Sequence, residues 1–478
     1  MNAKRTVLVP LSLLVLLLAA GPVGAIEPAA APADPTEVVP PPEAALEPTK
    51  TIPPGLAAGQ TLAFCGDSIT HQTLYTRYVA LFYHTRYPHT RVRVFNAGVG
   101  GNSALGALRR FRQDILEQKP TVVAVLFGMN DGGYKAFDEE TFAKYQANVT
   151  TILDRLRDEA KAQAILLTPT MYDHEVRARK RPKSRLSFDG YNQVLIRYGD
   201  WLKKTAKKRG LTAIDLNAPM VAATTELRKD DPKATLSRDG IHPAATGHWV
   251  MTHAILKGFG ATPVVSAVRV DAAAGTARCK RAELTNLQAG PAGVRFDLLA
   301  EALPMPYPAD AKAVLDIVPF TEDLNRETLQ VTGLPAGRYK LAIDGQAVGT
   351  HTAAEFAAGV NLATNAATPQ HKQAVQVWKV GLELQKEVLR ERRFRLMEKK
   401  KGYKNLDGTY PRKGVKRAKG PDGKDQWVTD EEWEKKFAEE AKKYPAILER
   451  LAALRDKVYE TNQPTRHHYE LTPAAAEP

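Results

Sequence analysis

Between residues 61 and 262, short apolar runs alternate with longer helical patterns along this 478-residue chain. Uninterrupted apolar runs of this length are typical of parallel strands that are buried on both faces. Strands separated by helices predict an α/β fold with a doubly wound, five-stranded parallel sheet. The expected strands are Thr61–Cys65, Val92–Asn96, Val122–Phe127, Ala164–Thr168 and Thr212–Asp215. The expected helices are Leu74–Tyr87, Ala104–Glu117, Phe142–Ala162 and Tyr191–Arg209.

After Thr262 the pattern changes to short strands broken by Pro and Gly, followed by charged helices. We expect an α/β domain at 59–262, a β-rich region at 263–350 and a charged helical region at 351–478, with a polar loop or disordered insert at 402–428. The segments on either side of Leu334–Gly337 predict a hairpin. The expected strands are Val264–Asp271, Thr276–Leu287, Val294–Leu299, Glu327–Thr332 and Arg338–Asp344, and the expected helical stretches are Ala353–Lys401 and Asp430–Tyr459.

The N-terminus has the three parts of a secretory signal peptide. Lys4 and Arg5 precede an apolar run from Val7 to Ala20, and small residues lead up to Ala25. We expect a signal peptide at 1–25, a secreted or periplasmic protein, and no stable membrane insertion after cleavage; an uncleaved membrane anchor is the alternative. Residues 26–58 are rich in Pro and Ala and predict an extended linker.

The distribution of charge and the number of cysteines argue against two classes of protein, nucleic-acid-binding proteins and disulfide-rich scaffolds. The formal net charge is +14, with 44% hydrophobic residues, and much of the basic excess follows Lys372, where Lys and Arg alternate with Glu. That texture is typical of a solvated or self-pairing helix face, and without an aromatic–basic stacking platform we expect no nucleic-acid partner. The two cysteines, Cys65 and Cys279, do not make a disulfide scaffold. The sequence leaves open whether they pair, and it does not indicate the oligomeric state.

Several candidate chemical groups follow the predicted strands. Ser68 lies in Gly-Asp-Ser directly after the first strand, where a strand-to-helix turn exposes a nucleophile; an ordinary turn with an N-cap serine is the alternative. The second strand leads into a Gly-rich stretch with Gly101, whose amide could face an oxyanion, although a plain turn or a phosphate loop has the same pattern. Asn130 follows the third strand and could donate its side-chain amide, or form an Asx-turn. Asp239 and His242 share a loop, three residues apart, as an acid and a base can.

The order of these blocks (Gly-Asp-Ser, Gly, Gly-x-Asn-Asp, Asp-x-x-His) resembles the GDSL/SGNH hydrolase family over residues 61–259. The resemblance implies the flavodoxin-like SGNH fold and a serine esterase. It assigns Ser68 as nucleophile, His242 as general base and acid, and Asp239 as the residue that orients His242. It also implies an oxyanion hole made by the backbone amides of Ser68 and Gly101 and the side chain of Asn130. Other stretches of the sequence, such as residues 318–325 (VPFTEDLN), resemble a subfamily of long secreted bacterial members of this family that carry a C-terminal extension.

The substrate is less well defined by the sequence. We expect a small-molecule or polysaccharide ester with a short acyl group; a lipase or lysophospholipase, and a non-catalytic carbohydrate- or surface-binding module, are the alternatives. His71 could line the acyl site, although a surface or capping histidine is the simpler interpretation. The segment 174–185 is expected to be a basic loop at the rim, and Arg179, Lys180 and Arg181 could attract an anionic substrate or simply be solvated. The acyl-enzyme route needs no metal or cofactor, and we expect none.

Overall fold

The computed structural model describes residues 51–400, 416–419, 425–428 and 430–474, all within the compact unit formed by residues 47–478. The predicted signal peptide and most of the predicted linker lie outside the described residues, as does much of the predicted insert. Within the insert, β14 (Lys416–Lys419) pairs antiparallel with β15 (Asp425–Val428), so this part is a strand pair and not the expected loop. None of the described helices is long and apolar enough to cross a membrane.

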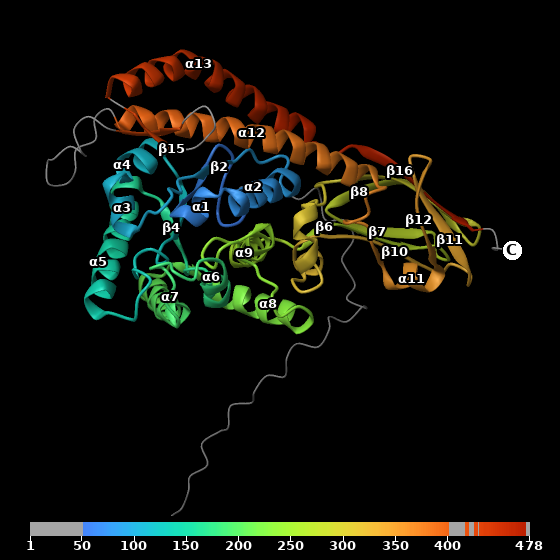
Figure 1. The fold of residues 1–478 in the computed structure, drawn as a ribbon. Helices are drawn as coiled ribbons and strands as arrows, with labels where there is room; N and C mark the ends of the chain where they lie inside the picture. Colours follow the sequence, from blue (N-terminus) through green and yellow to red (C-terminus); the bar gives the residue numbers. More distant parts are fainter. Residues whose placement is uncertain (1–50, 401–415, 420–424, 429, 475–478) are drawn as a thin grey trace, which may run out of the picture. The chain divides into compact units, whose positions relative to one another are not determined.

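A five-stranded parallel sheet forms the first part of the molecule, as the apolar runs predict (Figure 1). Its strand order is β2-β1-β3-β4-β5. The chain therefore places β2 on one side of β1 and then β3, β4 and β5 on the other side. Every residue of β1 and β3 is buried, which explains their uninterrupted apolar sequences. The strands are β1 (Thr61–Gly66), β2 (Arg93–Asn96), β3 (Val122–Leu126), β4 (Gln163–Leu167) and β5 (Thr212–Ile214).

Helices connect these strands, and most lie close to the predicted positions. The predicted helix 104–117 is broken at Arg110, whose φ and ψ are not helical. The predicted helix 142–162 begins earlier, because the Asp138 side chain caps it by accepting a hydrogen bond from Thr141 N. The helices are α1 (Ser68–His71), α2 (Leu74–Arg86), α3 (Ala104–Arg109), α4 (Phe111–Asp114), α5 (Glu139–Arg155), α6 (His174–Lys180), α7 (Tyr191–Arg209), α8 (Asn217–Asp230) and α9 (Ala245–Gly258).

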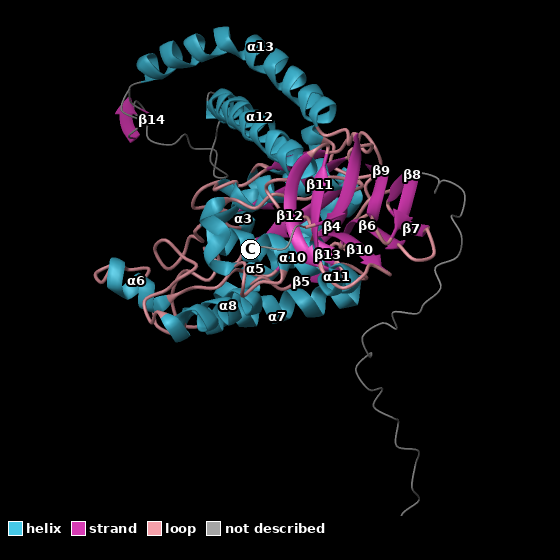
Figure 2. Ribbon diagram, turned by 90° about the vertical axis from the view of Figure 1, so that its right-hand side faces the viewer, coloured by secondary structure: helices cyan, strands magenta, loops and turns pink. Residues whose placement is uncertain are grey.

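Two further sheets follow (Figure 2). They share one apolar core, which includes Val270, Val331, Leu341 and Tyr469. One has the order β13-β10-β6-β7 and the other β12-β11-β16-β9-β8. The strands are β6 (Val264–Asp271), β7 (Thr276–Lys280), β8 (Ala282–Gly290), β9 (Gly293–Ala300), β10 (Arg326–Thr332), β11 (Arg338–Ile343), β12 (Gln346–Thr352), β13 (Val360–Asn361) and β16 (Arg466–Pro473). The predicted strand 276–287 is divided at Arg281, which has a positive φ.

The predicted hairpin around Leu334–Gly337 is wrong. Strand β10 pairs in parallel with β6, whereas β11 pairs with β12 and with β16 from the end of the chain. The turn therefore carries the chain from one sheet to the other. Both strands place alternate apolar side chains in the shared core, so crossing to the facing sheet buries them as well as a hairpin would.

Two long helices, α12 (Pro369–Lys400) and α13 (Asp430–Thr461), pack against each other, and α12 also packs against α2 (Figure 1). Ala374, Val377 and Leu384 of α12 belong to the same buried core as the parallel sheet. The predicted helical stretch from Ala353 is interrupted: α11 (Ala353–Ala358) ends at Gly359, and β13 follows it. The C-terminal extension is thus joined to the α/β domain through α12.

Candidate active site

Ser68 is the first residue of α1, immediately beyond the carboxyl end of β1. The N-cap of this helix is Asp67, whose carboxylate accepts a hydrogen bond from Ile69 N at 2.8 Å. Since Asp67 takes the capping role, the Ser68 hydroxyl is not used as an N-cap. Burial raises the pKa of Asp67 to about 7, although the hydrogen bond from Ile69 N lowers it.

Three predicted residues meet at this point. His242 Nε2 lies 2.9 Å from Ser68 Oγ, and His242 Nδ1 lies 3.0 Å from Asp239 Oδ2. Because a carboxylate only accepts hydrogen bonds, Nδ1 carries the proton, and Nε2 accepts from the hydroxyl of Ser68. Burial raises the pKa of Asp239, but hydrogen bonds from the side chain and backbone of His242 outweigh burial and hold that pKa well below its usual range. Asp239 is therefore charged at neutral pH, and the geometry suits proton transfer from serine to histidine.

A loop after β2, residues 97–102, lies beside α1, the helix that carries Ser68; we call it the glycine loop. Asn96, which precedes it, donates from Nδ2 to Thr70 O at 2.7 Å and so fastens the loop to α1. Gly101 has φ +68°, a left-handed conformation that favours glycine. The sequence offered a plain turn as an alternative, and the attachment to α1 shows that the loop is held against the helix that bears Ser68.

Asn130 links the glycine loop to the end of β3. Its Nδ2 donates to Asn102 O at 2.8 Å, and its Oδ1 accepts from Tyr134 Oη at 2.9 Å. An amide nitrogen carries two hydrogens, so one N–H of Asn130 is used by the loop and the second can serve a ligand. Next to it, the carboxylate of Asp131 accepts from Gly128 N at 3.0 Å and from Ala104 N at 2.9 Å. These bonds join the loop, the start of α3 and the turn after β3 into one frame.

Residues 64–250, which contain this frame together with Ser68 and His242, match the GDSL-like lipase/acylhydrolase family. The α/β domain belongs to that family. The sequence resemblance that rested on Gly-Asp-Ser and Asp-x-x-His is therefore confirmed, and the chain is an esterase-type hydrolase.

Similar proteins differ in how much of the chain they match. The acetylxylan esterase of Geobacillus stearothermophilus is 25% identical over 227 residues, which are 43% of this chain and 96% of that protein. A solved structure of that esterase, Axe2, covers 42% of this chain and 95% of its own at 25% identity, with a TM-score of 0.34. BT4096, described as a gut microbial diltiazem-metabolizing enzyme, matches 87% of this chain and 98% of its own at 28% identity, with a TM-score of 0.72. The similarity to BT4096 therefore includes the C-terminal extension beyond the GDSL-like domain.

His71, one turn beyond Ser68, contacts the glycine loop. Its Nδ1 lies 3.3 Å from the carbonyl oxygen of Gly98, so this nitrogen carries the proton and donates. Burial of the ring lowers the pKa of His71, which favours the neutral form. The residue as a whole is exposed although its ring is partly covered. The contact gives His71 a structural role, and a place for it in the acyl site stays a prediction.

The basic segment after β4 is not the loop that was expected over its whole length, because residues 174–180 form α6. The Asp173 carboxylate caps this helix by accepting from Val176 N, which the sequence reasoning overlooked. Lys180 Nζ donates to Arg238 O at 2.7 Å and Arg179 Nη2 donates to Lys233 O at 3.3 Å, while Arg181 is exposed. Two of the three candidate basic residues thus contact the segment that leads to Asp239.

Arg177, in the same helix, was missed by the sequence analysis. Its Nη1 donates to Asp239 O at 3.3 Å and lies 3.6 Å from Asp239 Oδ2, and its Nη2 donates to Ser184 Oγ at 2.7 Å. A Cβ at Gly240 would lie 2.5 Å from Asp173 O, so α6 is packed directly on the loop of the GDSL-like domain that carries Asp239. Nothing in a run of basic residues distinguishes the one that is buried, and no local signal could have identified Arg177.

Cys65 is buried in β1 and Cys279 is exposed in β7, and both are free thiols. Burial raises the pKa of Cys65 to about 11, so it is a protonated, unreactive thiol at neutral pH. Over the ranges that the structure describes, no group of three or more His, Cys, Asp or Glu side chains is arranged to hold a metal ion.

Proposed function

We propose that this protein is a secreted serine esterase that removes short acyl groups from extracellular carbohydrate through an acyl-enzyme. The observation that carries the proposal is the continuous hydrogen-bonded series from Ser68 Oγ through His242 to Asp239. Ser68 Oγ attacks the ester carbonyl while His242 Nε2 takes its proton, and the same nitrogen then protonates the departing alcohol. Water repeats the sequence on the acyl-enzyme, releasing the acid and regenerating the serine.

The oxyanion that forms in each step must be stabilised by hydrogen-bond donors. In this proposal they are the backbone amides of Ser68 and Gly101 and the second N–H of the Asn130 amide. Ser68 N belongs to the first turn of α1, where backbone amides have no partner within the helix. Each donor of this kind is typically worth about 3 kcal/mol of transition-state stabilisation.

The proposed substrate class is based on similarity to known proteins, and the proposed location is based on the N-terminal sequence. The GDSL-like domain is similar to an acetylxylan esterase, which supports an acetylated carbohydrate as substrate. The similarity to BT4096 also supports a small drug ester such as diltiazem as a test compound. The charged, apolar and small-residue segments at 1–25 support export. N-terminal sequencing of the protein recovered from the periplasm or medium tests this part, and an intact residue 1 on a cell-bound protein would contradict it.

The catalytic proposal is tested with p-nitrophenyl esters of increasing chain length, acetylated xylan and diltiazem. We expect hydrolysis of acetyl and butyryl esters, little hydrolysis of palmitoyl esters, and complete loss in Ser68→Ala. A fluorophosphonate should label the wild-type chain but not Ser68→Ala. A preference for long acyl chains would indicate a lipase instead, and absence of both labelling and hydrolysis would leave only a binding module.

A further inference from the structure

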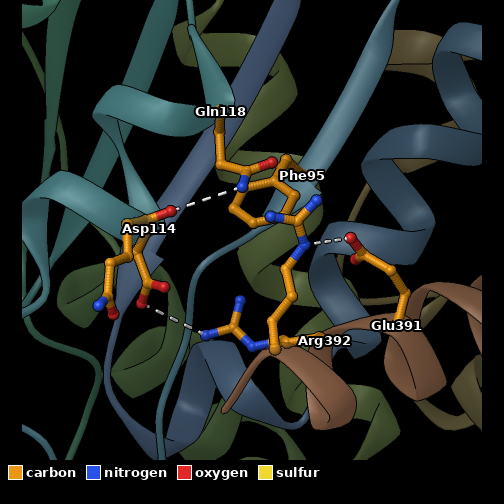
Figure 3. A pocket seen from close by; sticks show the side chains of 7 residues that line it. Phe95, Asp114, Gln118, Glu391 and Arg392 are labelled. Atoms are coloured by element: carbon orange, nitrogen blue, oxygen red, sulfur yellow. Dashed lines mark hydrogen bonds and ion pairs between the residues drawn. The ribbon is translucent and has the colours of Figure 1, made fainter. Parts of the chain in front are cut away.

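A buried arginine from the C-terminal extension reaches the glycine loop. Arg392, on α12, is 6% exposed, and its Nη2 donates to Gly98 O at 2.6 Å. Figure 3 shows the side chain extending from α12 toward Asp114, whose Oδ2 lies 3.9 Å from Nη2. Burial lowers the pKa of Arg392 to about 10, so the side chain is charged at neutral pH. It is separated from the glycine loop by 294 positions in the sequence.

The peptide between Gly98 and Val99 is fixed at both ends. Its carbonyl accepts from Arg392 and from His71 Nδ1, and its N–H donates to Gly66 O at 3.2 Å. Because a trans peptide is planar and its C=O and N–H point in opposite directions, holding both groups fixes the orientation of the plane. Gly66 is two residues before Ser68 and Gly98 is three residues before Gly101, so this plane spans the nucleophile and the proposed oxyanion donor.

A second arginine holds the preceding peptide. Arg110 Nη1 donates to Ala97 O at 2.8 Å, and Nη2 donates to Gly66 O at 3.1 Å. Arg110 also forms an ion pair with Asp114, the carboxylate nearest Arg392. The α/β domain therefore supplies Arg110 for Ala97, whereas Gly98 O is shared between His71 of that domain, at 3.3 Å, and Arg392 of α12, at 2.6 Å.

We propose that Arg392 is a positioning residue: the C-terminal extension uses it to hold the glycine loop in register with Ser68, so that the oxyanion donors are aligned. The proposal rests on the proposed esterase function and adds to it a role for the extension in catalysis. Arg392 acts through the Gly98 carbonyl and does not touch the substrate. Since oxyanion donors act mainly in the transition state, its loss lowers kcat far more than it raises KM.

The experiment measures kcat and KM for p-nitrophenyl acetate with full-length Arg392→Met, Arg392→Lys and a control, Arg395→Met. Arg395 lies one turn further along α12 and pairs with Glu391 of its own helix. We expect at least a ten-fold fall in kcat for Arg392→Met with KM within about three-fold of wild type. Arg392→Lys keeps one donor and should recover part of kcat, and the control should stay within about two-fold.

The outcomes separate the two proposals. If wild type hydrolyses the ester and folded Arg392→Met keeps kcat within two-fold, the positioning role is wrong and the esterase proposal stands. Equal losses in Arg392→Met and Arg395→Met would likewise overturn it, because they would indicate a general disturbance of α12. If Arg392→Met does not fold, Arg392→Lys decides: a fall of three-fold or more in kcat at unchanged KM supports the role, and unchanged kcat overturns it. A wild type without activity would refute the esterase proposal itself.

Discussion

A methyl group at Gly98 has no space, because the glycine loop lies against the backbone of α1. A Cβ built there would be 2.3 Å from His71 N and 2.5 Å from the carbonyl carbon of Thr70. Both neighbours are backbone atoms of α1, which cannot rotate away as a flexible side chain can. Since ordinary contacts begin at 3.4 Å, the loop and the helix must separate by about 1 Å in Gly98→Ala.

This separation has a calculable cost for catalysis. A misplacement of about 1 Å between reacting groups and their supporting donors typically costs about 100-fold in rate. That factor corresponds to about 2.7 kcal/mol of activation free energy. We therefore expect kcat of Gly98→Ala for p-nitrophenyl acetate to fall about 100-fold. Ser68 is carried by α1 and bonded to His242, so it should still react slowly with a fluorophosphonate.

Gly100→Ala is the matched control, because it is in the same loop and a Cβ there has no heavy atom within 4 Å. We expect its kcat to stay within about two-fold of wild type. Thermal unfolding of both variants shows whether each is folded at the assay temperature. If folded Gly98→Ala retained kcat within three-fold of wild type, contact between the glycine loop and α1 could not be what aligns the donors.

Three other perturbations test separate parts of the structure. Asp239→Asn removes the carboxylate that holds the imidazole, so kcat should fall by about 10³–10⁴-fold, and a loss below ten-fold on p-nitrophenyl acetate would contradict the assigned role. Charge reversal of Arg179, Lys180 and Arg181 should give equal losses of kcat/KM on neutral and anionic esters, because two of the three are held by backbone carbonyls; a selective loss on anionic esters would indicate a substrate contact instead. Burial raises the pKa of Glu327 to about 7, so its native form keeps a proton that the unfolded chain has lost, and stability falls as pH rises from about 4.5 to 7. Glu327→Gln should therefore gain more in Tm over wild type at pH 8 than at pH 5, and an equal difference at both pH values would refute this account.

The parallel sheet could be predicted because each of its buried strands can be recognised from its own apolar sequence. A strand buried on both faces must be apolar throughout, as in β3, so the sequence alone marks its position. The blocks that follow β1, β2 and β3 could then be placed together, since the carboxyl ends of parallel strands lie at one edge. The pairing of His242 with Ser68 needed the family resemblance, because the sequence places them 174 positions apart.

The two C-terminal sheets could not be assembled in the same way. The alternating pattern of β10 and β11 shows which side chains are inward but not which strand is the neighbour. Their actual partners are β6 and β16, and β16 begins at Arg466, far along the chain from Arg338. A short turn between two strands favours a hairpin locally, and here the shared core with the facing sheet decides otherwise.

The charged residues of α12 were expected to form a solvated or self-pairing face, and some of them do pair within the helix, but one arginine differs from the others. Arg390, which is exposed, pairs with the buried Glu387, and Arg395 pairs with Glu391. Arg392 is buried, and within the described residues its Nε and Nη1 have no hydrogen-bond partner. Burying a charge with unsatisfied donors costs free energy, so this arginine is a poor choice for stability alone.

Removal of Arg392 would leave few groups without partners. Gly98 O would still accept from His71, and Asp114 would still pair with Arg110. Arg392→Met, which keeps the apolar volume but not the buried charge, is therefore expected to leave Tm unchanged or raise it. Loss of the shorter of the two hydrogen bonds to Gly98 O should loosen this peptide and lower kcat in the same variant. Movement of Tm and kcat in opposite directions would indicate a positioning residue, since a side chain that served only to hold α12 in place would lower both.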